Sequence, residues 1–135
     1  MYQLKTDNSD SLNSALRKKI VEFNALHFDA QRLPLGFKFV DDNNEVVAGI
    51  SGYVFGNWLM ISWLWCSEVA RGQGLARQLL TSLENCAVEH GAVIALLDTL
   101  DFQAKPFYEK HGYSVKYQLN NYPYSGIRYF MEKSL

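Results

Sequence analysis

The spacing of apolar and polar residues predicts two long helices. From Ser11 to the stretch 33–36, apolar residues recur at three- and four-residue steps, and charged residues occupy the positions between them. The same period returns from about Gly74 to His90. One apolar stripe with this period is typical of an amphipathic helix. Gly91 is the expected end of the second helix.

Runs rich in β-branched and aromatic residues predict strands between and after these helices. The predicted strands cover residues 2–5, 36–41, 45–55, 58–66, 92–97, 113–119 and 127–132, and a shorter helix covers residues 103–111. Gly56 and Asn57 separate two of the strands and favour a β-hairpin. Because a helix separates the strands at 58–66 and 92–97, these two are expected to pair in parallel.

The near-unbroken apolar run at 58–66 predicts a central strand of the sheet, covered on both faces. Alternation along this strand places Trp63 and Trp65 on one face and Leu64 and Cys66 on the other. The two indoles either pack in the core or line a pocket at the end of the strand.

Composition narrows the class of protein. A chain of 135 residues with 48% hydrophobic content is long enough for one core, so a single domain over residues 1–135 is expected. The net charge of −1 gives no field that favours nucleic acid or an anionic membrane. Two cysteines are too few for a disulfide framework and lack zinc-ligand spacing. Without an apolar run of about 20 residues or a signal peptide, the expected compartment is the cytoplasm.

The stretch 64–80 carries the clearest chemical signal, because a strand there leads through a glycine-containing turn into a helix. Gly72 and Gly74 have no Cβ, so the chain can turn sharply and a ligand can approach the backbone. The unpaired N–H groups at the start of the helix favour an anion, most plausibly a phosphate. Arg71 and Arg77 add positive charge to this turn.

Two common phosphate-binding loops do not fit the stretch. A dinucleotide-binding loop follows the first strand of its domain and needs a third glycine, whereas Ala76 follows Gly74 here and the loop lies in mid-chain. A Walker loop requires Gly-Lys-Ser/Thr, which Gly74-Leu75-Ala76 does not provide. A phosphate-binding turn of another kind remains.

Two short motifs lie on either side of one predicted helix and one predicted strand. Residues 71–76 read Arg-Gly-Gln-Gly-Leu-Ala, and residues 104–113 read Ala-Lys-Pro-Phe-Tyr-Glu-Lys-His-Gly-Tyr. These motifs resemble the two signatures of the GNAT superfamily of N-acetyltransferases, Arg/Gln-x-x-Gly-x-Gly/Ala and Ala-x-x-x-Tyr-x-x-x-Gly-Phe/Tyr. The resemblance implies an α/β (α+β) fold in one domain: a mixed, mostly antiparallel twisted sheet of about six to seven strands, about three to four flanking helices, and a β-α-β cofactor unit.

The resemblance also implies acetyl-CoA as the cofactor, coenzyme A as its product, and no metal. The expected cofactor-binding residues are Leu64, Trp65 and Cys66 for the acetyl and pantetheine parts, and Arg71, Gly72, Gln73, Gly74, Leu75, Ala76 and Arg77 for the pyrophosphate. Tyr108 matches the tyrosine of the second signature and would be the general acid that protonates the leaving thiolate. An amine would attack the thioester directly while a backbone N–H stabilises the oxyanion.

The chain departs from the family pattern at one position and leaves the general base open. Where the family often has an asparagine that contacts the pantetheine arm, this chain has Asp101, and Gln103 is the expected substitute. Glu68 and Asp98 are candidate bases at predicted strand ends, although a solvated surface carboxylate is the more ordinary interpretation of each.

The resemblance does not identify the amine acceptor. In the family the acceptor site is formed by the first helix, the loop after it and the last hairpin, which here supply His27, Phe28, Asp29, Arg32, Tyr122 and Tyr124. These residues suggest an aromatic-lined pocket for a small-molecule amine, with polyamines, amino sugars, amino-acid derivatives and peptide or protein amines all open. A non-catalytic acyl-CoA sensor is the alternative function. An exposed edge strand and the aromatic last hairpin would also support a homodimer.

Overall fold

The computed structural model describes residues 1–135 and divides into two units, residues 1–31 and residues 32–135. The first unit contains helix α1 (Asp10–Asn24). Ser9 caps this helix, because its Oγ accepts a 3.2 Å hydrogen bond from the N–H of Leu12. Residues 2–5 form no strand, so that prediction was wrong. A short strand needs a paired neighbour, and the first unit contains no other strand.

The second unit is built on a six-stranded sheet in the order β1-β2-β3-β4-β6-β5. The strands are β1 (Leu33–Val40), β2 (Val46–Phe55), β3 (Trp58–Cys66), β4 (Ile94–Leu100), β5 (Ser114–Asn120) and β6 (Ile127–Ser134). The helices are α2 (Leu75–Glu89), α3 (Lys105–Lys110) and the 3-10 helix η1 (Glu68–Ala70). Every neighbouring pair is antiparallel except β3 and β4, which are parallel. The predicted mixed, mostly antiparallel sheet is therefore confirmed.

The two largest differences from the predicted strand boundaries, of three residues each, have physical reasons. Strand β4 continues to Leu100 instead of ending at residue 97, because β6 pairs with it as far as Arg128 opposite Leu100. Strand β1 begins at Leu33 and so includes Pro34. Since β1 is an edge strand, the missing N–H of Pro34 can be tolerated there.

Strands β3 and β4 pair over only a short part of their length. Residues Trp58–Met60 pair with residues Ile94–Leu96, and no later residues of the two strands pair. A bulge lies just beyond, because Gly52 of β2 is opposite Ile61 whereas the preceding Ser51 is opposite Trp63. Ser62 is the extra residue on β3, and such a bulge bends its strand. The two central strands therefore separate toward their carboxyl ends.

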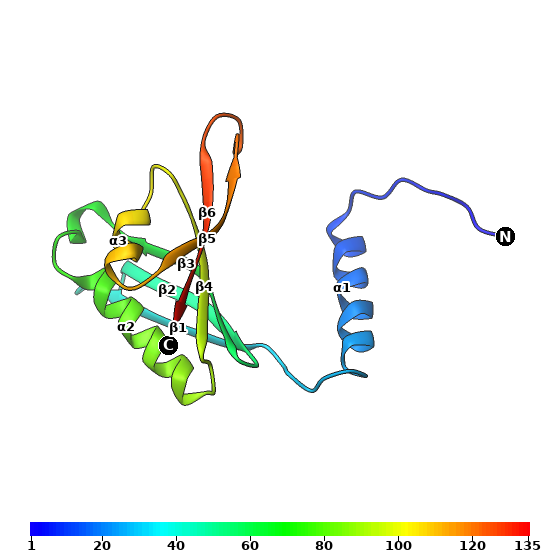
Figure 1. The fold of residues 1–135 in the computed structure, drawn as a ribbon, viewed down its shortest axis with the longest axis horizontal. Helices are drawn as coiled ribbons and strands as arrows, with labels where there is room; N and C mark the ends of the chain where they lie inside the picture. Colours follow the sequence, from blue (N-terminus) through cyan, green and yellow to red (C-terminus); the bar gives the residue numbers. More distant parts are fainter. The chain divides into compact units, whose positions relative to one another are not determined.

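Helices α2 and α3 lie on the same face of the sheet and cover the core (Figure 1). Helix α2 packs on β1, β2 and β3 through an apolar face that includes Leu79, Leu80 and Leu83. Its Glu84 is also buried, and its carboxylate accepts hydrogen bonds from the Tyr113 hydroxyl (2.7 Å) and from Lys133 Nζ (3.0 Å). The charge is thus fully paired. None of the helices is both long enough and apolar enough to cross a lipid bilayer.

Candidate active site

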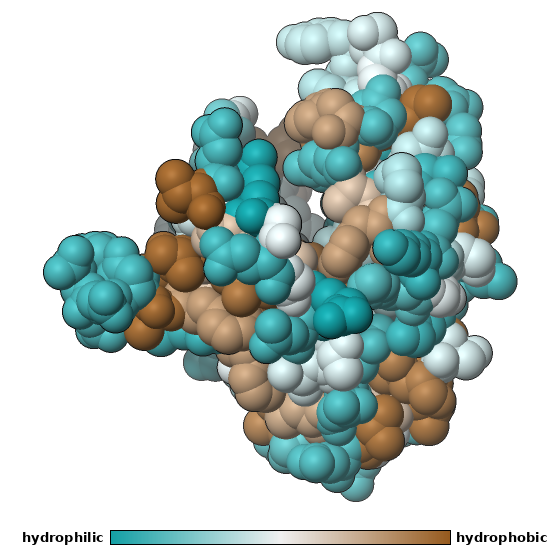
Figure 2. All heavy atoms as spheres, turned by 90° about the vertical axis from the view of Figure 1, so that its left-hand side faces the viewer, coloured by the Kyte–Doolittle hydropathy of each residue, from teal (hydrophilic) through white to brown (hydrophobic).

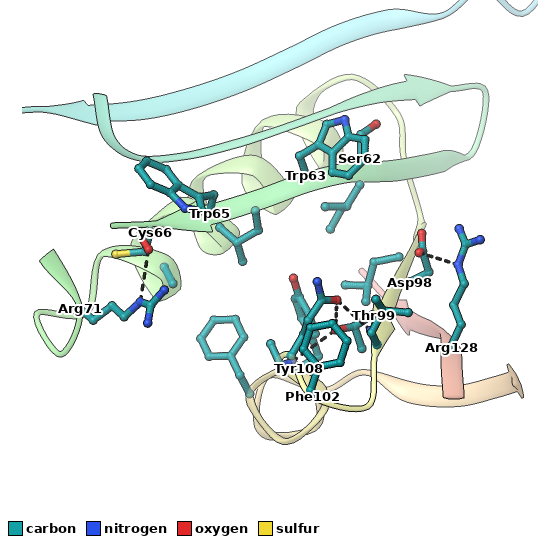
Figure 3. A pocket seen from close by; sticks show the side chains of 18 of the residues that line it. Ser62, Trp63, Trp65, Cys66, Arg71, Asp98, Thr99, Phe102, Tyr108 and Arg128 are labelled. Carbon is teal, nitrogen blue, oxygen red and sulfur yellow. Dashed lines mark hydrogen bonds and ion pairs between the residues drawn. The ribbon is translucent and has the colours of Figure 1, made fainter. Parts of the chain in front are cut away.

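A cleft of about 660 Å³ opens where β3 and β4 separate. Its walls are residues 61–66 of β3 and residues 97–100 of β4, together with residues of the turn before α2, of α3 and of the β5–β6 hairpin. Figure 2 faces this side of the molecule and shows the surface hollowed there. Along the cleft, Arg71 lies at one end, Asp98 and Arg128 lie at the other, and Tyr108 lies between them (Figure 3).

The turn between η1 and α2 forms the first end of the cleft. Gly72 and Gly74 have φ angles of 79° and 76°, in the left-handed region that glycine adopts without strain. The first helical hydrogen bond of α2 runs from the N–H of Gln78 to Gly74, so the amides before Gln78 have no partner within the helix. Arg71 Nε donates a 3.3 Å hydrogen bond to the carbonyl of Cys66. This bond holds the positive charge beside the turn.

Tyr108 of α3 lines the middle of the cleft, and only 7% of its surface is exposed. Its ring meets those of Phe107 and Tyr113 edge-on, with centroid distances of 5.3 and 5.8 Å. Its hydroxyl makes no hydrogen bond within the chain. Burial and the negative charge of Asp98 raise the pKa of Tyr108 to about 12. At neutral pH the hydroxyl therefore stays protonated and can act as a proton donor.

An ion pair forms the second end of the cleft. Arg128 Nε of β6 donates a 2.8 Å hydrogen bond to Asp98 Oδ2 of β4, and Arg128 Nη1 donates to the Tyr122 hydroxyl at 3.3 Å. The guanidinium also lies over two rings, 4.9 Å from the centroid of Phe130 and 5.3 Å from that of Tyr122. These contacts hold Arg128 in one orientation. The hydrogen bond to Asp98 is the main cause of the raised pKa of Arg128.

The expected cofactor-binding residues fall into two groups. Those that line the cleft are Leu64, Trp65, Cys66, Arg71, Ala76 and Gln103, and those that form the adjoining turn and the start of α2 are Gly72, Gln73, Gly74, Leu75 and Arg77. Gln103 Oε1 accepts hydrogen bonds from the N–H of Leu100 (2.8 Å) and from Thr99 Oγ1 (3.3 Å). The glutamine thus also fixes the turn from β4 to α3. Asp101 lies outside the cleft lining.

The predicted base and acceptor residues are not all brought together. Asp98 and Tyr122 line the cleft, whereas Glu68 lies in η1 outside its lining. Tyr124 is 90% exposed and also lies outside the lining. His27 and Phe28 belong to the first unit, so their place in an acceptor site stays a prediction.

Several cleft residues were not singled out from the sequence. They include Ser62, Thr99, Phe102, Phe107 and Arg128. Nothing local in the sequence marks Arg128, because its role depends on β6 lying next to β4. The polar Ser62 in the middle of the apolar run 58–66 was a usable signal, since it marks the bulge. Trp63 and Trp65 both line the cleft, which favours the pocket interpretation of these indoles.

Comparison with known proteins identifies the class to which this fold and cleft belong. The acetyltransferase (GNAT) family matches residues 2–113. The chain belongs to this family and is an acetyltransferase.

Two relatives are similar to this chain over most of their length. The acetyltransferase Atu2258 of Agrobacterium fabrum is 32% identical over 101 residues, which are 74% of each chain. The blasticidin-S acetyltransferase of Streptomyces morookaense is 33% identical over 95 residues, which are 70% of each chain.

Solved structures share the fold. The crystal structure of an acetyltransferase from Bacillus cereus has a TM-score of 0.88 and 26% identity, with 98% of both chains covered. An aminoglycoside 6′-N-acetyltransferase, solved in complex with coenzyme A, has a TM-score of 0.64 and 17% identity, with 97% of both chains covered. The second likeness shows the fold alone.

Proposed function

We propose that this acetyltransferase transfers the acetyl group of acetyl-CoA to a primary amine of a small molecule. The observation that carries the proposal is one cleft that runs from the amide turn before α2 to the unpartnered hydroxyl of Tyr108. An anion site and a proton donor are the two groups that such a transfer requires from the protein.

The residues present fit acetyl-CoA, which supplies an acyl group activated as a thioester. The unpaired amides before Gln78 and the guanidinium of Arg71 suit a pyrophosphate. Residues 61–66 of β3 pair with β2 on one edge only, so their other edge offers backbone groups to the amides of a pantetheine arm. The aminoglycoside acetyltransferase that shares this fold was solved with coenzyme A, which supports the same use here.

The chemistry assigned to the chain consists of two proton transfers and the alignment of two substrates. As the amine nitrogen bonds to the carbonyl carbon and the carbon–sulfur bond breaks, Tyr108 gives its hydroxyl proton to the sulfur. Asp98, which lines the cleft near Tyr108, accepts the proton lost from nitrogen, directly or through water. Alignment along β3 provides the remaining acceleration.

A small molecule is the proposed acceptor because one similar protein is a blasticidin-S acetyltransferase. The cleft volume of about 660 Å³ is also in the range typical of small-ligand sites. Peptide and protein amines are the alternative acceptors.

The test is to incubate the protein with acetyl-CoA and a panel of amines while free thiol is followed. The panel contains polyamines, amino sugars, amino-acid derivatives and peptides, and acetylated products are identified by mass spectrometry. We expect thiol release that depends on both protein and amine. If coenzyme A binds but no amine is acetylated, the enzymatic proposal is wrong and the sensor alternative is favoured. The cytoplasmic location and the homodimer stay predictions, the second testable by sedimentation.

A further inference from the structure

The guanidinium of Arg128 has donors that the chain does not use. Of its five N–H groups, Nε–H is bound to Asp98 and one Nη1–H is bound to Tyr122. The other Nη1–H and both hydrogens of Nη2 make no hydrogen bond within the chain. The side chain is 29% exposed and lines the cleft. A guanidinium with three unused N–H donors therefore lies at the end of the cleft opposite Arg71.

Contacts within the chain hold the guanidinium of Arg128 in one orientation when no ligand is bound. Phe130 and Tyr122 contribute aromatic rings within 4.9 and 5.3 Å of the guanidinium carbon, and Asp98 fixes the Nε side. A guanidinium held in this way loses little side-chain freedom when it binds a ligand. Two parallel N–H groups on one edge match the two oxygens of a carboxylate.

Asp98 adds a second, opposite charge beside this guanidinium. Its Oδ2 accepts from Arg128, while Oδ1 makes no hydrogen bond within the chain. Asp98 lies between Tyr108 and the guanidinium of Arg128 in Figure 3, and its charge contributes to the raised pKa of Tyr108. Along the cleft the order is thus Tyr108, then a carboxylate, then a guanidinium edge (Figure 3). A molecule with an amine at one end and an anionic group near it complements this order.

We propose that the acceptor is an amine that also carries a carboxylate, and that Arg128 binds this carboxylate through its free edge while the amine lies toward Asp98 and Tyr108. This inference rests on the proposed function and narrows its substrate class to amino-acid-like amines. Arg128 then determines specificity, since a neutral amide in place of the carboxylate leaves the guanidinium edge with a weaker partner.

The test compares acceptors that differ only in this group. Each carboxylate-bearing amine, such as β-alanine, an α-amino acid or a dipeptide, is paired with its carboxamide, and kcat/KM is measured for both with the unchanged protein and with Arg128→Gln. Because the two members of a pair differ in amine pKa, the quantity compared is the carboxylate-to-carboxamide ratio. We expect Arg128→Gln to lower this ratio by about tenfold or more, mainly through KM. Arg128→Lys, which keeps the charge without the guanidinium, is expected to lower it less.

Lys38→Gln is the matched control. Lys38 is an exposed cation on the edge strand β1 and does not line the cleft. This variant removes one positive charge, as Arg128→Gln does, and is expected to leave the ratio unchanged.

Two failures are distinguishable in the same experiment. If amines are acetylated but carboxylate and carboxamide lose activity equally in Arg128→Gln, Arg128 only holds Asp98, and the inference is wrong while the proposed function stands. If no amine releases thiol from acetyl-CoA, the proposed function fails and the inference fails with it.

Discussion

The ring of Tyr113 stands edge-on to the ring of Tyr108, with 5.8 Å between their centroids, so a residue outside the cleft supports the proposed proton donor. The hydroxyl of Tyr113 donates a 2.7 Å hydrogen bond to Glu84 of α2, which Lys133 of β6 also binds. Burial and this hydrogen bond raise the pKa of Tyr113 far above its usual value. The network therefore connects α2, the start of β5 and β6 directly behind the active-site tyrosine.

Replacement of the Tyr113 hydroxyl should weaken the fold more than the chemistry. Tyr113→Phe removes one hydrogen bond to a buried carboxylate, so the free energy of unfolding in urea is expected to fall by about 1–3 kcal/mol. Since the ring remains beside Tyr108, kcat should change little. Tyr117→Phe is the control, because Tyr117 is 63% exposed and its hydroxyl makes no hydrogen bond in the chain. An equal effect of the two substitutions on unfolding would contradict the role of the network.

Removal of the Tyr108 hydroxyl should act on turnover. Tyr108→Phe keeps the buried ring but takes away the proposed proton donor, so kcat is expected to fall by about 10²–10⁴-fold. The affinity for coenzyme A, measured by calorimetry, should stay nearly constant because the amide turn before α2 is untouched. Tyr129→Phe is a suitable control on β6, outside the cleft lining. Unchanged turnover in Tyr108→Phe would remove the general-acid assignment.

The fold of the half of the cleft that we assign to the cofactor could be predicted because its parts are local in sequence. Strand β3, the turn with Gly72 and Gly74, and helix α2 follow one another along the chain, with only η1 between β3 and the turn. Each is specified by short-range signals, namely apolar runs, glycines in a turn and a helical period. The same locality explains why the parallel pairing of β3 with β4 was predicted correctly.

The acceptor half could not be predicted, because it depends on the order of strands in the sheet. Strand β6 inserts between β4 and β5, which places Arg128 opposite Leu100 and diagonal to Asp98, thirty residues away in sequence. Cross-strand neighbours of this kind follow from register, which the sequence pattern alone leaves open. The pair Glu84 and Lys133, 49 residues apart, was missed for the same reason.

The pH dependence of turnover should reflect the raised pKa of Tyr108. An ordinary tyrosine is half deprotonated near pH 10, whereas Tyr108, with a pKa of about 12, keeps its proton there. Because the protonated form is the proposed donor, kcat is expected to rise as the amine loses its proton and then to stay level through about pH 10.5. The pH dependence of kcat is measured from thiol release, after subtraction of the acetyl-CoA hydrolysis that occurs without protein. A descending limb centred near pH 10 would contradict the assignment, provided that circular dichroism shows the protein still folded.

Gly72 and Gly91, two glycines with positive φ near opposite ends of α2, allow backbone strain to be separated from ligand binding. Gly72 (φ 79°) lies in the turn before α2, and Gly91 (φ 94°) lies just after its end; a Cβ at either position would meet no atom within 4 Å. Gly72→Ala and Gly91→Ala should therefore each cost about 1–2 kcal/mol of unfolding free energy, from the left-handed backbone alone. Only Gly72→Ala places a methyl group beside the proposed pyrophosphate site, so only this variant should weaken coenzyme A binding, by about tenfold or more. Calorimetric titration with coenzyme A, alongside urea unfolding, measures both effects. If both variants bind coenzyme A as the unchanged protein does, the turn before α2 is not where the pyrophosphate lies.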